Sequence, residues 1–122
     1  MTEHSKPPRH PDNVLFGLGR VVATPGALRQ FVRHQVDPFT LLCRHITNDW
    51  GECDTEDMKA NDQAVIHGTR ILSVYCLEHQ EPGSSEEALP AHRFAVPARG
   101  LIVWCITEAD RSVTTFLLPS EY

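Results

Sequence analysis

Five residues of the types used in acid–base and anion chemistry fall into two separated groups of this chain. His45 precedes Asp49 by four residues, and Glu108, Asp110 and Arg111 stand close together near the C-terminus. In one interpretation His45 is a general base that Asp49 orients, and Arg111 holds an anionic group. The competing interpretation is structural, because polar residues are expected in a hairpin turn and a histidine at a helix end complements the helix dipole.

A run of acidic residues around position 54 predicts a binding surface for a basic protein partner. The alternative is an ordinary solvated helix face. Trp50 lies within this run, and a tryptophan there either closes the bottom of the core or projects as an interface anchor. The candidate binding residues are Asp49, Trp50, Asp54, Glu56, Asp57, Asp110 and Arg111.

Metal binding is a weaker interpretation of the cysteines and histidines. Cys43 and His45 stand two residues apart, and Cys76 and His79 stand three apart. Together they offer four ligands of the type that zinc uses. On a helix, however, residues two apart point about 200° from each other. Cys76 also completes an apolar strand face with Leu72 and Val74, which predicts a core residue. We therefore predict no metal ligands and no cofactor.

Length and composition are those of one globular domain. The chain has 122 residues, of which 41% are hydrophobic, and a formal net charge of -5. This charge argues against nucleic acid or an anionic membrane as partner. Residues 1–13 are polar and proline-rich without the apolar stretch of a secretory signal, so we expect a mobile tail, a single domain over residues 14–122, a cytoplasmic location and free thiols.

Local start and stop signals predict three helices and three or four strands. Thr24-Pro25 and Asp37-Pro38 are typical helix starts, a third helix begins after Asp54 or Thr55, and Gly68 ends it. Strands are predicted over residues 19–23, 71–77, 101–107 and 113–118, with a long loop over residues 78–91. We therefore predict an α+β fold, with an antiparallel sheet of three to four strands and about three helices packed on one face.

Four stretches of the chain carry a further signal together: Leu18 to Leu28, Arg44-His45 followed by Asp49-Trp50-Gly51, Ile106 to Thr115, and Leu117 to Tyr122. In these stretches the chain resembles a family of small bacterial proteins. Members of that family are often labelled plasmid-related or hypothetical, and sometimes as restriction-modification subunits. The family has no settled activity, so the resemblance implies no catalytic residues. It implies a bacterial cytoplasmic protein encoded on a mobile element.

Three hypotheses about function follow from these observations. The first is a small non-enzymatic interaction or regulatory protein that binds another protein. The second is a small hydrolase or toxin-like ribonuclease that uses His45, Glu108 and Arg111. The third is a structural homo-oligomer that associates through an exposed strand edge or through the third helix.

Overall fold

The fold is a four-stranded sheet with helices on one face and at one edge. A computed structural model describes residues 14–77 and 102–122, and the predicted tail and the predicted loop over residues 78–91 lie outside these ranges. The strands stand in the order β1-β4-β3-β2. In chain order the elements are β1 (Arg20–Ala23), α1 (Pro25–His34), α2 (Pro38–His45), α3 (Thr55–His67), β2 (Ile71–Cys76), β3 (Ile102–Thr107), β4 (Val113–Leu117) and the 3-10 turn η4 (Pro119–Glu121).

This arrangement confirms the α+β prediction and corrects the direction of one strand. Strands β2, β3 and β4 are antiparallel neighbours, whereas β1 runs parallel to β4. The sheet is therefore mixed and not antiparallel throughout. The β3–β4 hairpin follows from local turn signals, but the direction of β1 depends on a partner about ninety residues later in the chain.

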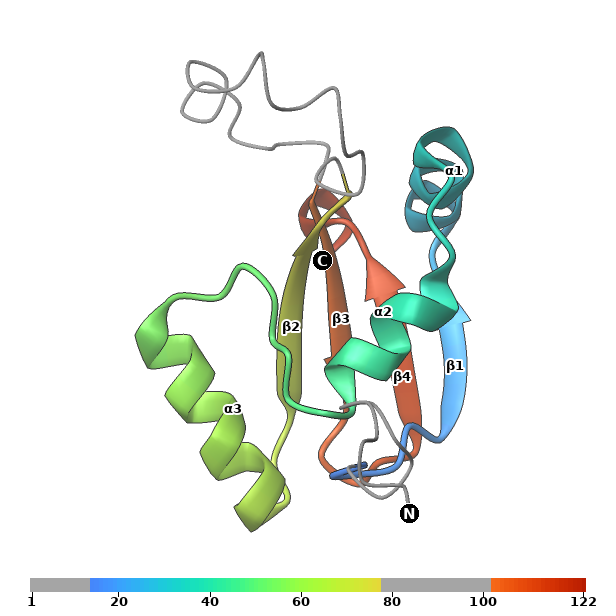
Figure 1. The fold of residues 1–122 in the computed structure, drawn as a ribbon. Helices are drawn as coiled ribbons and strands as arrows, with labels where there is room; N and C mark the ends of the chain where they lie inside the picture. Colours follow the sequence, from blue (N-terminus) through green and yellow to red (C-terminus); the bar gives the residue numbers. More distant parts are fainter. Residues whose placement is uncertain (1–13, 78–101) are drawn as a thin grey trace, which may run out of the picture.

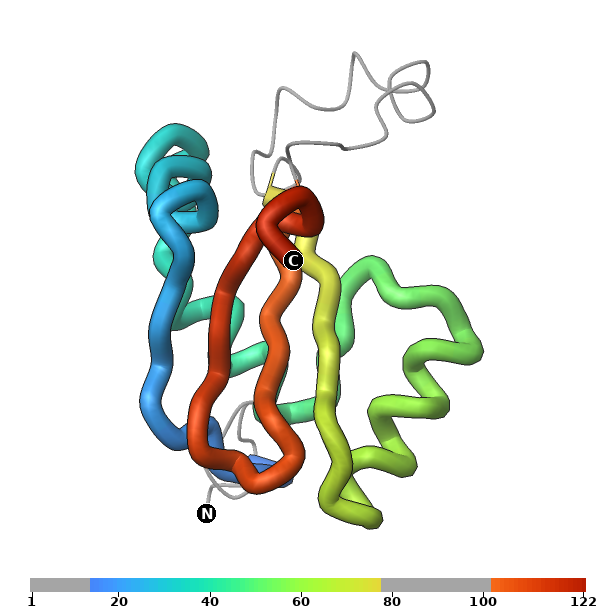
Figure 2. The backbone as a smooth tube through the Cα atoms, turned by 180° about the vertical axis from the view of Figure 1, so that it is seen from behind, coloured from blue at the N-terminus to red at the C-terminus, as the bar shows by residue number. Residues whose placement is uncertain are grey.

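Helices α1 and α2 lie over one face of the sheet, and α3 lies alongside β2 (Figure 1). Seen from the opposite side, the sheet stands in front of α2, α1 lies at the upper end of β1, and α3 flanks the β2 edge (Figure 2). The two edges of the sheet therefore have different surroundings.

Side-chain caps fix the starts of the helices as predicted. The Thr24 side chain accepts a hydrogen bond from the Ala27 N–H, and Asp37 accepts from Phe39. Asp54, the first of the two predicted alternatives, caps α3. Gly68 ends that helix at a φ of 74°, a left-handed conformation that glycine adopts without steric penalty.

The main core lies between the sheet and helices α1 and α2. Phe31 of α1 meets Phe116 of β4 edge-on, with ring centroids 5.1 Å apart. On β2 the buried side chains are those of Ile71, Ser73 and Tyr75. The prediction that Cys76 is a core residue is therefore wrong: Cys76 shares the other, half-buried face of β2. Alternation fixes which residues share a face, but it does not say which face the helices cover.

Candidate functional site

His45 lies at the centre of a buried chain of hydrogen bonds. Its Nδ1 is 2.6 Å from Ser73 Oγ on β2, and its Nε2 is 2.9 Å from Thr107 Oγ1 on β3. Thr107 Oγ1 is in turn 2.7 Å from Thr114 Oγ1, which donates to the Leu18 carbonyl at 2.8 Å. These hydrogen bonds therefore connect α2 to three strands of the sheet.

The acceptor at the end of this chain fixes the position of every proton in it. A carbonyl oxygen only accepts, so Thr114 uses its single hydroxyl proton there and must accept from Thr107. Thr107 then accepts from the N–H at Nε2 of His45, and Nδ1 accepts from the Ser73 hydroxyl. Burial, together with the positive charge of Arg111, lowers the pKa of His45 to about 3. The neutral imidazole thus acts as a structural link between α2 and the sheet.

Arg111 connects the β3–β4 turn to the end of α3. Its guanidinium donates to the carbonyl oxygens of Thr69 at 2.7 Å and Ala64 at 3.0 Å. It also lies over the ring of Phe16, 5.4 Å from the centroid. Glu108 contacts Arg70 instead, at 3.2 Å near the surface. Arg111 is also near enough to His45 for its positive charge to disfavour protonation of the imidazole. Glu108 is not part of this arrangement, because it forms a separate ion pair.

The predicted acidic binding residues are spread over several local structures. Asp49 forms an ion pair with Arg44 at 2.8 Å, and Asp110 accepts from the backbone N–H of Ser112. Trp50 is buried and donates from Nε1 to Asp62 at 3.1 Å, so it lies in the core. Of the predicted acidic residues, Asp54, Glu56 and Asp57 lie together at the surface, in the cap and first turn of α3.

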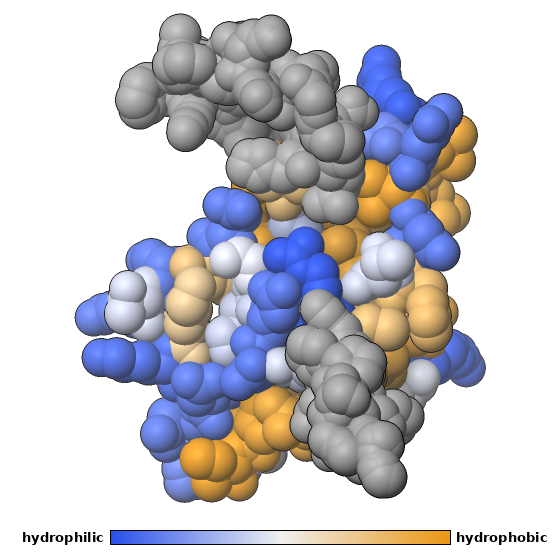
Figure 3. All heavy atoms as spheres, in the orientation of Figure 1, coloured by the Kyte–Doolittle hydropathy of each residue, from blue (hydrophilic) through white to orange (hydrophobic). Residues whose placement is uncertain are grey.

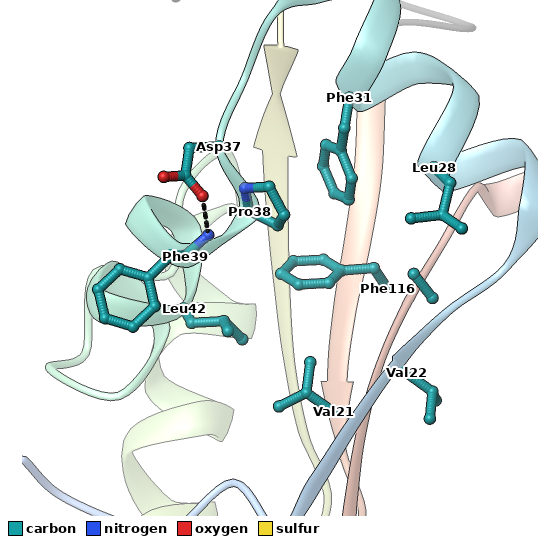
Figure 4. A pocket seen from close by; sticks show the side chains of 10 residues that line it. Val21, Val22, Leu28, Phe31, Asp37, Pro38, Phe39, Leu42 and Phe116 are labelled. Atoms are coloured by element: carbon teal, nitrogen blue, oxygen red, sulfur yellow. Dashed lines mark hydrogen bonds between the residues drawn. The ribbon is translucent and has the colours of Figure 1, made fainter.

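An apolar groove opens between α1, α2 and β1. It has a volume of about 380 Å³, and its lining is apolar except for Asp37 (Figure 4). Large apolar side chains are exposed at its rim: Phe39 is 64% exposed, Leu28 50% and Val21 42%. Apolar surface also lies around α1 and α2 in Figure 3, whereas the surface of α3 is mainly polar except at its lower end. We call this feature the β1 groove, lined by Val21, Val22, Ala23, Leu28, Phe31, Asp37, Pro38, Phe39, Leu42 and Phe116.

Phe39, Leu42, Cys43 and Ile46 recur at helical spacing in the sequence, a pattern that predicts one apolar stripe on α2. The buried residues of α2 are instead Leu41 and His45. The helix turns a polar histidine inward because Ser73 and Thr107 meet its ring, and this rotation leaves Phe39 at the surface. A hydropathy pattern counts histidine as polar, so the pattern carries no signal for the groove.

The two edges of the sheet differ in how their backbone is covered. The Arg20 N–H donates to the carbonyl oxygen of Ser112, just before β4, and the Thr24 N–H donates to that of Phe116 in β4, at 3.0 Å each. Strand alternation then directs the backbone groups of Val21 and Ala23 outward, and within residues 14–77 and 102–122 no strand pairs with them. At the opposite edge, the Val74 N–H donates to the Trp50 carbonyl at 3.0 Å, and the Val74 carbonyl accepts from Glu52.

No family model, curated protein or solved structure matches this chain. In the described part of the chain, no three residues of the metal-ligating types stand together. None of the helices described has the length and apolar character needed to cross a bilayer. All four cysteines lie in the described ranges and none forms a disulfide.

Proposed function

We propose that this chain is a non-enzymatic interaction protein that binds a segment of a partner protein in the β1 groove. The observation that carries the proposal is the pair of exposed apolar side chains at the rim, Leu28 and Phe39. Exposed apolar side chains gathered around a concave surface are typical of protein interaction sites. His45, by contrast, is buried among hydroxyl groups that use all of its hydrogen-bonding capacity, which gives the hydrolase hypothesis no support.

The chemistry of the groove indicates the kind of partner. The floor and rim of the groove favour a partner with apolar side chains, because such a segment, once bound, removes the exposed Leu28 and Phe39 side chains from water. Asp37 is the charged residue in the lining and is itself exposed. We therefore expect the bound segment to carry two or three apolar residues and a lysine or arginine that reaches Asp37.

A displayed library of random peptides, selected on the full chain, tests this proposal. Selected peptides should be apolar with one basic residue. Their affinity should fall about tenfold or more for Phe39→Ser, because a single well-packed anchor contributes that much. Ile66→Ser is the matched control, since Ile66 is an equally exposed apolar helix residue on α3. Failure to select peptides whose binding depends on Phe39 would contradict the proposal.

The role of Asp37 is tested separately by Asp37→Asn. Asparagine caps a helix as well as aspartate does, so the hydrogen bond from the Phe39 N–H is kept while the charge is lost. We expect the variant to bind the selected peptides more weakly and with less dependence on salt.

The bacterial mobile-element context rests on the family resemblance alone and is a separate expectation.

A further inference from the structure

We propose that the outer edge of β1 pairs with β1 of a second copy of this chain, antiparallel and about a two-fold axis at Val22. The two sheets then become one continuous sheet, with the helices of both copies on the same face. The argument rests on the backbone of β1, on its side chains, on one charge pair and on the covered state of the opposite edge.

The backbone of β1 is self-complementary about Val22. Val21 and Ala23 both direct their N–H and C=O groups outward, because Arg20 and Thr24 on either side bond to β4. In an antiparallel pair centred on Val22, Val21 of one copy stands opposite Ala23 of the other. Two such hydrogen-bonded pairs form, one on each side of the axis. Exposed strand edges of this kind are templates for pairing.

The side chains of β1 suit this register. Val22 is 39% exposed and meets Val22 of the second copy across the axis, in the pair type that brings side chains closest. Val21 is 42% exposed and meets Ala23 of the second copy on the helix face. Apolar and β-branched cross-strand pairs stabilise a sheet, whereas β1 has no proline or inward charge that would oppose pairing.

One charge pair favours the same register. Arg20 would stand directly opposite Thr24 of the second copy. The Thr24 hydroxyl donates to Glu121 Oε1 at 2.5 Å, and the Gly26 N–H donates to Oε2 at 3.1 Å, so the Glu121 carboxylate is held beside Thr24. Arg20 of each copy thus lies next to a carboxylate of the other. The pairing brings an arginine beside a carboxylate twice, and Arg29 of the same copy already acts on that carboxylate.

The opposite edge of the sheet limits the assembly to two copies. Its Leu72 and Val74 backbone groups already bond to Asn61, Trp50 and Glu52. A second β1 has no open edge to add to there, so the pairing closes as a dimer and does not extend into a filament. The dimer also sets the two β1 grooves on either side of the axis, a consequence that matters only if the proposed function holds.

Analytical ultracentrifugation of the full chain over a range of concentrations tests the dimer. We expect a species of two 13.7 kDa chains that dissociates on dilution. Val22→Lys should give a monomer at all concentrations, because it sets two lysines against each other across the axis. Ile66→Lys, on α3, should leave the dimer unchanged. A monomeric natural chain, or a dimer that survives Val22→Lys, would overturn the proposal.

A cysteine at the axis gives direct evidence of the register. Non-hydrogen-bonded antiparallel pairs hold their Cα atoms about 4.5 Å apart, within the range of a disulfide. Val22→Cys should therefore cross-link two chains under mild oxidation. Val32→Cys, which is 76% exposed on α1, should cross-link no more than the natural chain. Equal cross-linking of the two variants would exclude this register.

The two proposals fail in distinguishable ways. Peptides that bind a monomer in a Phe39-dependent manner would leave the proposed function standing and remove the dimer. A Val22-dependent dimer that selects no Phe39-dependent peptide would leave the dimer standing and remove the groove as a partner site.

Discussion

The side-chain amide of Asn61 pairs with both backbone polar groups of Leu72. Asn61 Nδ2 donates to the Leu72 carbonyl at 2.7 Å, and the Leu72 N–H donates to Asn61 Oδ1 at 3.0 Å. This is the pattern that a neighbouring strand would make, provided here by one residue of a helix. It covers an edge that would otherwise expose an unpaired donor and acceptor. It also fixes α3 to the sheet where the helix has little apolar surface to bury.

Asn61→Ala should destabilise the protein by about 2 to 4 kcal/mol, since two partly buried backbone groups lose their partners. Alanine is a good helix former, so the loss is not one of helix propensity. Urea unfolding followed by circular dichroism measures the change in the free energy of unfolding. Lys59→Ala, at an exposed position of the same helix, should change it by less than about 0.5 kcal/mol. Equal effects of the two substitutions would contradict the role given to Asn61.

The buried His45 should make stability fall in acid. Its pKa in the folded protein is about 3, below its ordinary value of 6.5. The unfolded chain therefore binds a proton that the folded chain does not between these two values, and stability is lost as the pH falls from about 6.5. Each unit of difference corresponds to about 1.4 kcal/mol, so the loss by pH 3 is about 4 to 5 kcal/mol from this residue.

Unfolding curves measured from pH 7.5 to pH 4 test this dependence. His45→Gln keeps a donor and an acceptor but does not titrate. The variant should be less stable at pH 7 and should show a flatter decline toward acid. His67→Gln is the control, because His67 is exposed and contacts only Gln63 among the described hydrogen bonds. An unchanged slope in His45→Gln would show that folding does not lower the pKa of His45.

Local signals in the sequence predict the helix starts well, because the caps at Thr24, Asp37 and Asp54 act within three residues. The β3–β4 hairpin is predictable for the same reason. The parallel direction of β1 is not, since it depends on β4 far along the chain. The attachment of α3 also escapes prediction: the helix is held through Asn61 and Arg111 and not by an apolar stripe.

The candidate site divides in the same way. The sequence singles out His45 and Arg111, and the structure brings the two near each other. Nothing in the residue pattern says that Ser73, Thr107 and Thr114 surround the imidazole, because these residues come from three different strands. The β1 groove depends on which strand lies at the edge of the sheet, which is a property of topology and not of any local segment.

Two glycines in left-handed conformations should respond differently to alanine. Gly51 and Gly68 have φ values of 77° and 74°. A Cβ on Gly51 would lie 2.0 Å from the Val74 carbonyl oxygen, whereas a Cβ on Gly68 meets nothing within 4 Å. Both substitutions carry the backbone penalty of about 1 to 2 kcal/mol. Gly51→Ala must also displace β2 backbone, so we expect a loss greater than about 3 kcal/mol or failure to fold.

Urea unfolding of Gly68→Ala and Gly51→Ala, measured side by side, separates conformational strain from collision. The difference between the two variants reports the close approach of residue 51 to Val74. Similar stabilities would show that the Trp50–Glu52 segment moves away from β2 without loss, and that this edge of the sheet is only weakly held.

The four cysteines should react with a thiol reagent in two groups. Cys43 and Cys76 are half-buried, whereas Cys53 and Cys105 are buried. Burial raises the pKa of the Cys105 thiol, and burial followed by the charge of Asp57 raises that of Cys53. The thiolate is the reactive form, so limited access and reduced ionisation both slow the reaction of these two residues.

Ellman's reagent at pH 8 should therefore give a fast phase from Cys43 and Cys76 and a slow phase that accelerates on unfolding. Mass spectrometry of partly labelled protein assigns the phases, and fast labelling of Cys105 in folded protein would contradict its place in the core.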